Sequence, residues 1–274
     1  MPFFELQDVK LWYDEYGSGD EVVLSSASGF DRYPAVLADA PTGCHVFTIQ
    51  ARGFGRSSHL SAPPEQGWLD QWADDVLAFA DHLGVSRFVY TGVSHGAGIG
   101  WHIARRHPER LKALVSVVGT PHDRAGDTSS SAGRRAIVEN RKDTGVLEEQ
   151  FRILGGATDT PEQAAVREET IAALVRHHLE YSDEEARINQ GMPFPEAKTN
   201  DELAAILRTI DLPVLILAGL RDGVISPEST LRAARNVRRS KAVLFEDEGH
   251  FIARERPERL VAEVAVYLEE LKAR

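Results

Sequence analysis

Short apolar runs alternate with segments of helical periodicity over most of the chain. Alternating apolar and polar residues from Val9 to Tyr16 predict an early strand. Later runs are continuously apolar, which is typical of strands buried on both faces of a parallel sheet. These further predicted strands are Val22–Leu24, His45–Ile49, Arg87–Thr91, Leu111–Val118, Val214–Ala218 and Ala242–Phe245.

Amphipathic segments separate these strands. Apolar residues recur at helical spacing between Leu69 and Leu83, and the predicted helix stops at Gly84. Strands that alternate with helices imply an α/β fold, in which helices flank a mostly parallel sheet on both faces. Other helices are predicted over Tyr33–Ala40, Ile99–Arg106, Pro227–Val237 and Leu260–Leu271.

The strand signal is absent between Thr120 and about Thr209. Capping boxes at residues 160–163, 182–185 and 199–202 predict three helix starts, and a Ser-rich loop is expected over residues 127–133. A helical block inside an α/β alternation predicts a lid over a site. We therefore expect a core of residues 1–120 and 210–274, with a helical cap of residues 121–209 inserted into it.

Charge and cysteine content narrow the class of protein. The net charge of −11 argues against nucleic acid and anionic membrane as partners. The single cysteine, Cys44, allows no intrachain disulfide, which fits a reducing compartment. The N-terminal residues lack a signal-peptide pattern, and no apolar run is long enough to span a membrane. We expect a cytoplasmic globular enzyme, and a homodimer is compatible with the sequence.

The segment Gly92–Gly96 reads Gly-Val-Ser-His-Gly and carries the clearest chemical signal. It follows a predicted strand and precedes a predicted helix, which is the context in which G-x-S-x-G forms a sharp turn. Such a turn presents the Ser94 hydroxyl beside the positive end of a helix. A simple Gly/Ser turn would give the same five letters, so the rest of the chain has to decide.

A serine hydroxyl needs a base to remove its proton, and the base needs a carboxylate to orient it. Asp222 comes just after the predicted strand that ends at Ala218, and His250 comes after the next strand. The chain order is therefore Ser, Asp, His, each on a loop after a different parallel strand. Such loops are where open α/β sheets build their sites.

Other polar residues compete for these roles. His95 adjoins Ser94, but local packing or hydrogen bonding explains it more simply than a role as base. His122 and Asp123 follow the strand that ends at Val118, where His122 could line a pocket and Asp123 is a reserve carboxylate. Asp247 and Glu248 are loop acids next to His250 and are expected to be solvated.

No pattern in the sequence predicts a metal or nucleotide site. His177 and His178 are adjacent on a predicted helix, so they face different directions and make a poor metal pair. Neither H-E-x-x-H, clustered Cys/His nor a P-loop occurs. We expect no metal and no cofactor.

Nearly the whole chain resembles the α/β-hydrolase fold family, in the branch with a helical cap after the sixth strand. The matching features are Ser28-Gly29-Phe30, Arg52–Ser57, the Ser94 turn, His107–Leu111 and the loops of Asp222 and His250. The resemblance implies that Ser94 is the nucleophile, His250 the general base and acid, and Asp222 its orienting partner. It also implies that the backbone N–H groups of Phe30 and His95 form the oxyanion hole.

Two positions depart from the family pattern. The usual His-Gly before the oxyanion residue is Ser28-Gly29 here, and the usual acidic residue at the position of Gln50 is absent. Neither change removes a catalytic group, but the first alters the polarity of the pocket floor. The candidate pocket residues are Ser28, Gly29, Trp101, His122, Phe151 and Met192, although core packing is the simpler explanation for Trp101, Phe151 and Met192.

These features predict a cofactor-free serine hydrolase that cleaves a small or medium carboxylic ester or lactone through an acyl-enzyme on Ser94. Dehalogenases and epoxide hydrolases of this fold carry aspartate at the elbow, so the serine argues against those reactions. Cleavage of a C–C bond in a β-diketone-like substrate and perhydrolase chemistry use the same triad and stay open. A ligand-binding receptor on the hydrolase fold, with little or no turnover, is a further alternative.

Overall fold

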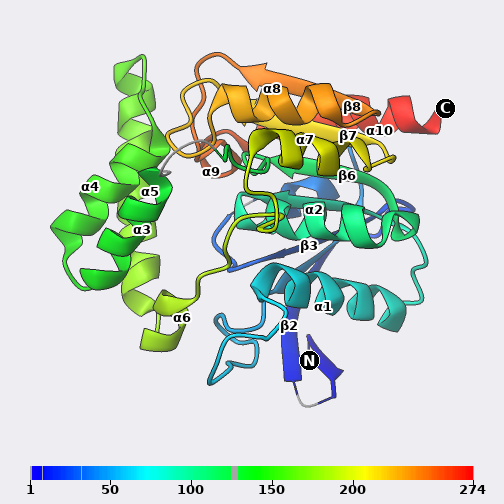
Figure 1. Cartoon of the computed structure of the whole chain (residues 1–274), viewed down its shortest axis with the longest axis horizontal. Coiled ribbons are helices and arrows are strands. Elements are labelled where there is room, and N and C mark those ends of the chain that lie inside the picture. The colour runs from blue at the N-terminus through cyan, green and yellow to red at the C-terminus, as the bar shows by residue number, and fades with distance from the viewer. Residues whose placement is uncertain (1, 8, 32, 125–128, 274) are drawn as a thin grey trace.

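The predicted strands lie side by side in one sheet (Figure 1). The computed structural model describes residues 2–7, 9–31, 33–124 and 129–273. Over these residues the strand order is β1-β2-β4-β3-β5-β6-β7-β8. β2 pairs antiparallel with β1 and β4, and the remaining pairs are parallel. The strands are β1 (Phe3–Leu6), β2 (Val9–Tyr16), β3 (Val22–Ala27), β4 (His45–Gln50), β5 (Phe88–Val93), β6 (Leu111–Val117), β7 (Val214–Gly219) and β8 (Ser240–Phe245).

Helices cover both faces of the sheet, which confirms the predicted α/β architecture. Successive side chains of a strand point to opposite faces. Leu24 of β3 therefore enters one hydrophobic core and Val23 the other. The first core is closed by α1 (Trp68–His82), α2 (His95–Arg106), α7 (Asn200–Arg208) and α8 (Pro227–Asn236). The second is closed by the 3₁₀ turn η1 (Ala35–Ala38), α9 (Ile252–Glu255) and α10 (Pro257–Lys272).

Two local predictions near the N-terminus are wrong. The helix expected over Tyr33–Ala40 is only the short turn η1, because proline at positions 34 and 41 brackets it and proline cannot supply the N–H that a longer helix needs. The edge strand β1 was not predicted, since its four residues are too few to show a clear alternation. A second 3₁₀ turn, η2 (Pro108–Arg110), leads into β6.

Four further helices stand together at one end of the sheet, on the left of Figure 1. The capping boxes at the starts of α5 and α6 are both formed as predicted. Residues 127 and 128 of the predicted Ser-rich loop lie outside the described residues, and α3 occupies the rest of it. None of the described helices combines the length and apolarity that crossing a membrane requires. The four are α3 (Ser129–Glu139), α4 (Thr144–Gly155), α5 (Pro161–Glu180) and α6 (Asp183–Arg187).

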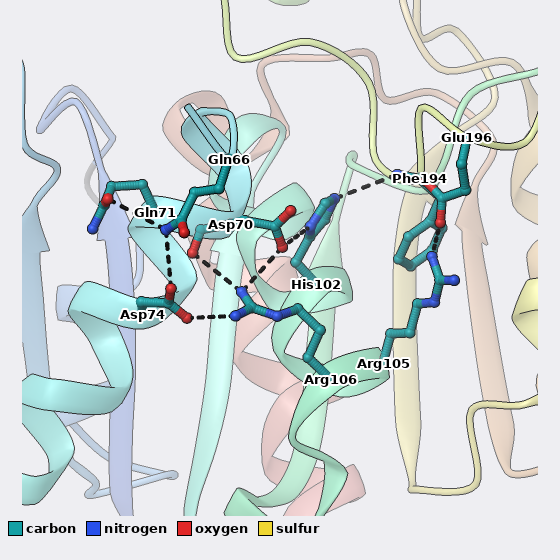
Figure 2. A network of polar contacts seen from close by, with 9 residues as sticks. All are labelled: Gln66, Asp70, Gln71, Asp74, His102, Arg105, Arg106, Phe194 and Glu196. Carbon is teal, nitrogen blue, oxygen red and sulfur yellow. Dashed lines mark hydrogen bonds and ion pairs between the residues drawn. The ribbon is translucent and has the colours of Figure 1, made fainter. Parts of the chain in front are cut away.

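The chain returns from these helices to α7, whose predicted capping box is also formed. Figure 2 shows the polar network that holds this return segment against α1 and α2. His102 Nδ1 donates to Asp70 at 2.8 Å, and Nε2 accepts from the Phe194 N–H at 3.3 Å. Burial lowers the pKa of His102, so the neutral ring can donate and accept at once. Arg106 adds ion pairs to Asp70 and Asp74, which join the two helices.

Candidate active site

Ser94 lies on a strained turn between β5 and α2. Its φ of 50° and ψ of −109° are unusual for a residue with a side chain. A Cβ on Gly92 would lie 2.2 Å from the Gly96 carbonyl carbon, and a Cβ on Gly96 would lie 2.7 Å from the Ser26 carbonyl oxygen. Both glycines are therefore required for the strand and helix to approach this closely, and the turn places Ser94 at the carboxyl end of β5.

A continuous chain of hydrogen bonds joins the three residues that the sequence put in Ser, Asp, His order. His250 Nε2 lies 3.1 Å from Ser94 Oγ, and His250 Nδ1 lies 2.9 and 3.0 Å from the two Asp222 carboxylate oxygens. Because a carboxylate only accepts, Nδ1 carries the proton and the neutral ring leaves Nε2 free to accept from the serine hydroxyl. This is the geometry of an activated nucleophile.

The loop after β7 holds Asp222 in place. The N–H groups of Val224 and Ile225 donate to its Oδ1 at 2.7 and 2.9 Å, and the side chain is 0% exposed. Burial by itself lowers the pKa of His250, but the charge and hydrogen bond of Asp222, together with the charge of Asp31, outweigh it. The pKa of His250 is therefore raised above its ordinary value.

The two backbone N–H groups expected to form an oxyanion hole belong to His95, directly after Ser94, and to Phe30, on the loop after β3. His95 is the first residue of α2, where N–H groups have no acceptor within the helix and the helix dipole favours negative charge. Arg254 holds Phe30, the other residue. It donates to the Phe30 carbonyl oxygen at 3.2 Å, and its guanidinium lies 4.6 Å from the centre of the Phe30 ring. Phe30 is thus anchored from the core side.

Burial lowers the pKa of two histidines near Ser94, namely His95, which follows it directly, and the candidate pocket residue His122. The His95 side chain is solvent accessible, yet burial within the protein lowers its pKa to about 3. His122 lies close enough for the charges of His250 and Asp222 to act on it, and burial lowers its pKa to about 4.

The other candidate pocket residues divide into two groups. Ser28 and Gly29 lie on the loop that leads to Phe30, and Met192 is partly exposed, with its sulfur 3.5 Å from Arg124. Trp101 and Phe151 are buried in hydrophobic clusters. The Trp101 indole is fully buried and donates to Ser116 and Gly119, while Phe151 packs inside the cap against the His178 ring.

Gln50 takes over a structural role at the position where the family carries an acid. Its Nε2 donates to the Ser28 carbonyl oxygen at 3.3 Å, and its Oε1 accepts from the Arg56 N–H at 2.7 Å. Gln50 therefore links the loop of Ser28–Phe30, called the oxyanion loop because Phe30 is a proposed oxyanion donor, to the loop after β4. It also borders a cavity of about 330 Å³ behind the oxyanion loop, which Gly29, Phe30 and Asp31 line as well.

The reserve acids are engaged elsewhere. Asp123 pairs with Arg232 at 3.1 Å and accepts from the Asn200 amide at 2.6 Å. Asp247 and Glu248 both pair with Arg259, so they are not simply solvated as the sequence led us to expect. Asp222 is the carboxylate that meets His250.

Three charged or titratable residues near the site were missed from the sequence. Asp31 could have been singled out from the sequence, because this charged residue directly follows Phe30, a proposed oxyanion donor. Arg134 and His178 lie on α3 and α5, where nothing in the local sequence shows which residues face Ser94. The charge of Arg134 lowers the pKa of both His95 and His178.

The cap helices are fastened to the loop that carries His250. The backbone N–H of His250 donates to the Gly155 carbonyl oxygen at 3.3 Å. Arg167 on α5 pairs with Glu255 through two hydrogen bonds of 2.6 and 3.0 Å, and side-chain exposure is only 5% and 7%. Helices α4 and α5 are therefore packed against the segment that carries His250 and Glu255.

Comparison with known proteins places this geometry in a family. The model of the alpha/beta hydrolase fold matches residues 24–257. The chain belongs to this family and is an α/β-fold hydrolase, as its resemblance led us to expect.

Similar proteins include hydrolases with different substrates. 3-Oxoadipate enol-lactonase 2 of Acinetobacter baylyi is 25% identical over 237 residues, which cover 82% of each chain. Epoxide hydrolase A of Mycobacterium tuberculosis is 26% identical over an alignment of 315 residues, covering 97% of this chain and 96% of the relative. The solved structure of Est816, described as an N-acyl homoserine lactone degrading enzyme, matches with a TM-score of 0.73 at 25% identity. It covers 96% of this chain and 98% of Est816.

Proposed function

We propose that this protein is a cofactor-free serine hydrolase that cleaves a small or medium carboxylic ester or a lactone. The proposal rests on the hydrogen-bonded chain from Ser94 Oγ through His250 to buried Asp222. A neutral imidazole in this position can take the serine proton, and the carboxylate stabilises the imidazolium that forms.

The reaction proceeds through an acyl-enzyme. Ser94 Oγ attacks the carbonyl carbon while His250 Nε2 takes its proton, and the oxyanion accepts from the N–H groups of Phe30 and His95. One such donor typically lowers the barrier by about 3–4 kcal/mol. His250 then protonates the leaving oxygen as the C–O bond breaks. In the second half, His250 removes a proton from water, the hydroxide attacks the acyl carbon, and Ser94 leaves with the proton from His250.

The names of the relatives support esters and lactones over epoxides. The enol-lactonase and Est816 are both named for lactone substrates. The epoxide hydrolase relative covers as much of the chain, but this chain carries serine at the elbow, where epoxide hydrolases of this fold carry aspartate. A serine hydroxyl needs the base that His250 supplies, whereas a carboxylate nucleophile does not.

Hydrolysis of a panel of p-nitrophenyl esters and simple lactones by wild type and Ser94→Ala tests the proposal. We expect the variant to lose at least about 10³-fold in kcat with its fold intact. Wild-type turnover by Ser94→Ala would overturn the proposal. Product analysis separates the alternatives, because cleavage of a C–C bond yields two carbonyl fragments and no alcohol. If the protein binds a ligand saturably but shows no turnover that depends on Ser94, the result would instead indicate a receptor.

A further inference from the structure

The C-terminal end of the cap helix α4 touches the loop that carries Asp222. A Cβ on Gly156 would lie 1.5 Å from the Arg221 carbonyl oxygen, and a Cβ on Gly223 would lie 2.1 Å from the Ile153 carbonyl oxygen. Gly156 also has a φ of 78°, a conformation that residues with a side chain rarely adopt. Backbone therefore lies directly against backbone, and the two neighbours of Asp222 in the chain make the contact.

The same end of α4 touches the loop that carries His250. The His250 N–H donates to the Gly155 carbonyl oxygen at 3.3 Å, and a Cβ on Gly249 would lie 2.0 Å from that oxygen. The last carbonyl groups of a helix have no partner within the helix. One of them therefore accepts from the backbone of the proposed catalytic base.

The two loops are also joined to each other. The Arg221 N–H donates to the Glu248 carbonyl oxygen at 2.9 Å, and a Cβ on Gly219 would lie 2.1 Å from the same oxygen. Three backbone segments, which are the end of α4 and the two loops, thus pack on one another beyond the carboxyl ends of β7 and β8. A displacement of the end of α4 would disturb both loops at once.

Arg167 on α5 fixes this end of α4 in place. Its Nη1 donates to the Gly156 carbonyl oxygen at 2.7 Å, while its other nitrogens form the buried ion pair with Glu255. Glu255 is the last residue of α9, which begins two residues after His250. One cation therefore links α4 and α5 to the segment that follows His250.

The spacing of the two loops matters because the contact between Asp222 and His250 spans them. His250 Nδ1 lies 2.9 and 3.0 Å from the two carboxylate oxygens of Asp222. The N–H groups of Val224 and Ile225 bind the same carboxylate, so it moves together with its own loop. A shift of about 1 Å along the contact would take it out of hydrogen-bond range.

We propose that the C-terminal end of α4, through Gly155 and Gly156, is a positioning element for catalysis. It sets the spacing of the two loops and thereby holds the Asp222 and His250 side chains in contact. The inference rests on the proposed hydrolase function and adds two residues of the cap to the groups on which that reaction depends. Gly155 and Gly156 act on the reacting atoms only through Asp222 and His250. The cap helices are then required for the chemical step itself.

Gly156→Ala tests the proposal, because the new Cβ collides with the Arg221 carbonyl oxygen and the end of α4 has to move. A misplacement of about 1 Å can cost about 100-fold in rate. We expect kcat on a p-nitrophenyl ester to fall about 100-fold while KM changes by less than about 3-fold. Gly145→Ala, in the first turn of the same helix, is the control. Its Cβ would meet no described atom closer than Asp143 Oδ1 at 3.4 Å, so kcat should stay at the wild-type value.

The state of His250 can be measured without a substrate. The charge and hydrogen bond of Asp222 raise the pKa of His250, so a weakened contact should lower that pKa. NMR titration of protein with isotope-labelled histidine measures it, and His250→Gln identifies the signal. The pKa should be lower in Gly156→Ala than in wild type and Gly145→Ala. The charges of Asp31 and Arg167, which also act on His250, are retained in all three proteins.

Either a wild-type kcat or a wild-type pKa of His250 in folded Gly156→Ala would overturn the proposal. If this variant does not fold, Gly155→Ala decides in the same way. Its Cβ would meet only the ends of the Arg167 and Phe251 side chains, at 2.4 and 3.0 Å, so the loss in kcat should be about 10-fold. Absence of turnover by wild type on every substrate would count against the hydrolase function, whereas the pKa of His250 would still decide the role of α4.

Discussion

Asp31 is a titratable carboxyl whose charge raises the pKa of His250, the proposed catalytic base. Burial raises the pKa of Asp31 to about 6, from an ordinary value of 3.8, although the positive charges of His250 and Arg254 oppose the shift. The residue directly follows Phe30, which is anchored by Arg254, and it lines the cavity behind the oxyanion loop. Replacing it by asparagine removes the charge and keeps the shape.

The effect of Asp31→Asn on stability follows from this raised pKa. A carboxyl whose folded pKa lies above its unfolded pKa favours folding below about pH 4, and that contribution is lost as pH rises through about 6. The full difference is worth about 3 kcal/mol at neutral pH. Because the side chain borders a cavity, solvent reduces the cost, and we expect Asp31→Asn to be about 1–3 kcal/mol more stable than wild type at pH 8.

Urea unfolding of wild type and Asp31→Asn at pH 5 and pH 8 measures this difference. The gain should be clear at pH 8 and about half as large at pH 5, where the carboxyl is mostly protonated in the folded state and mostly ionised in the unfolded state. Asp39→Asn, at an exposed position of the following segment, is the control and should change neither value by more than about 0.5 kcal/mol. A gain that does not depend on pH, or a loss of stability at pH 8, would refute the electrostatic reasoning.

The same variant has a catalytic consequence. The Asp31 charge is one of the groups that raise the pKa of His250, and His250 must be neutral to act as base. The rate should therefore fall on the acid side as pH drops through the raised pKa. In Asp31→Asn this acid limb of kcat/KM should move to lower pH, which a pH–rate profile on one ester measures directly. An unmoved limb would mean that the two groups are not coupled.

Two further variants test the site and its attachment to the cap. Asp222→Asn should lower kcat by about 10⁴-fold, because the His250 ring loses the partner that fixes its tautomer. Steady-state kinetics measure this loss, and circular dichroism checks that the variant is folded. A near-normal kcat would contradict the prediction. Glu255→Gln leaves Arg167 buried without its counter-charge and should cost about 3–5 kcal/mol in urea unfolding, while the exposed Glu168→Gln should cost less than about 1 kcal/mol. Equal effects of the two substitutions would argue against a stabilising role of the buried Arg167–Glu255 ion pair.

Features with a local cause could be predicted from the sequence. The elbow needs glycine at positions 92 and 96 because a Cβ at either would clash, so the pattern itself records the turn. The capping boxes each involve four consecutive residues, and all three are formed where predicted. Asp222 and His250 each follow a predicted strand, and parallel strands bring their carboxyl ends to one edge of the sheet.

Burial could not be assigned in the same way. Trp101 was a candidate pocket residue on the helix that follows Ser94. In the structure it points to β6, where Ser116 and Gly119 accept from its indole N–H. A helix was predicted over Tyr33–Ala40, but only the short turn η1 forms there, between two prolines and with Leu37 packed in the same core as Val46 of β4.

The sequence by itself determined the α/β alternation, the order of Ser94, Asp222 and His250, and the turn that presents the serine. The periodicity of apolar residues predicts the strands and helices, and the glycine spacing predicts the turn. The position of each catalytic candidate just after a predicted strand gives their order. Only the tertiary structure decided that burial raises the pKa of Asp31 and that the charge of Asp31 acts on His250. Desolvation and charge coupling depend on which distant segments meet in space, and they set the pKa values and the polarity of the site.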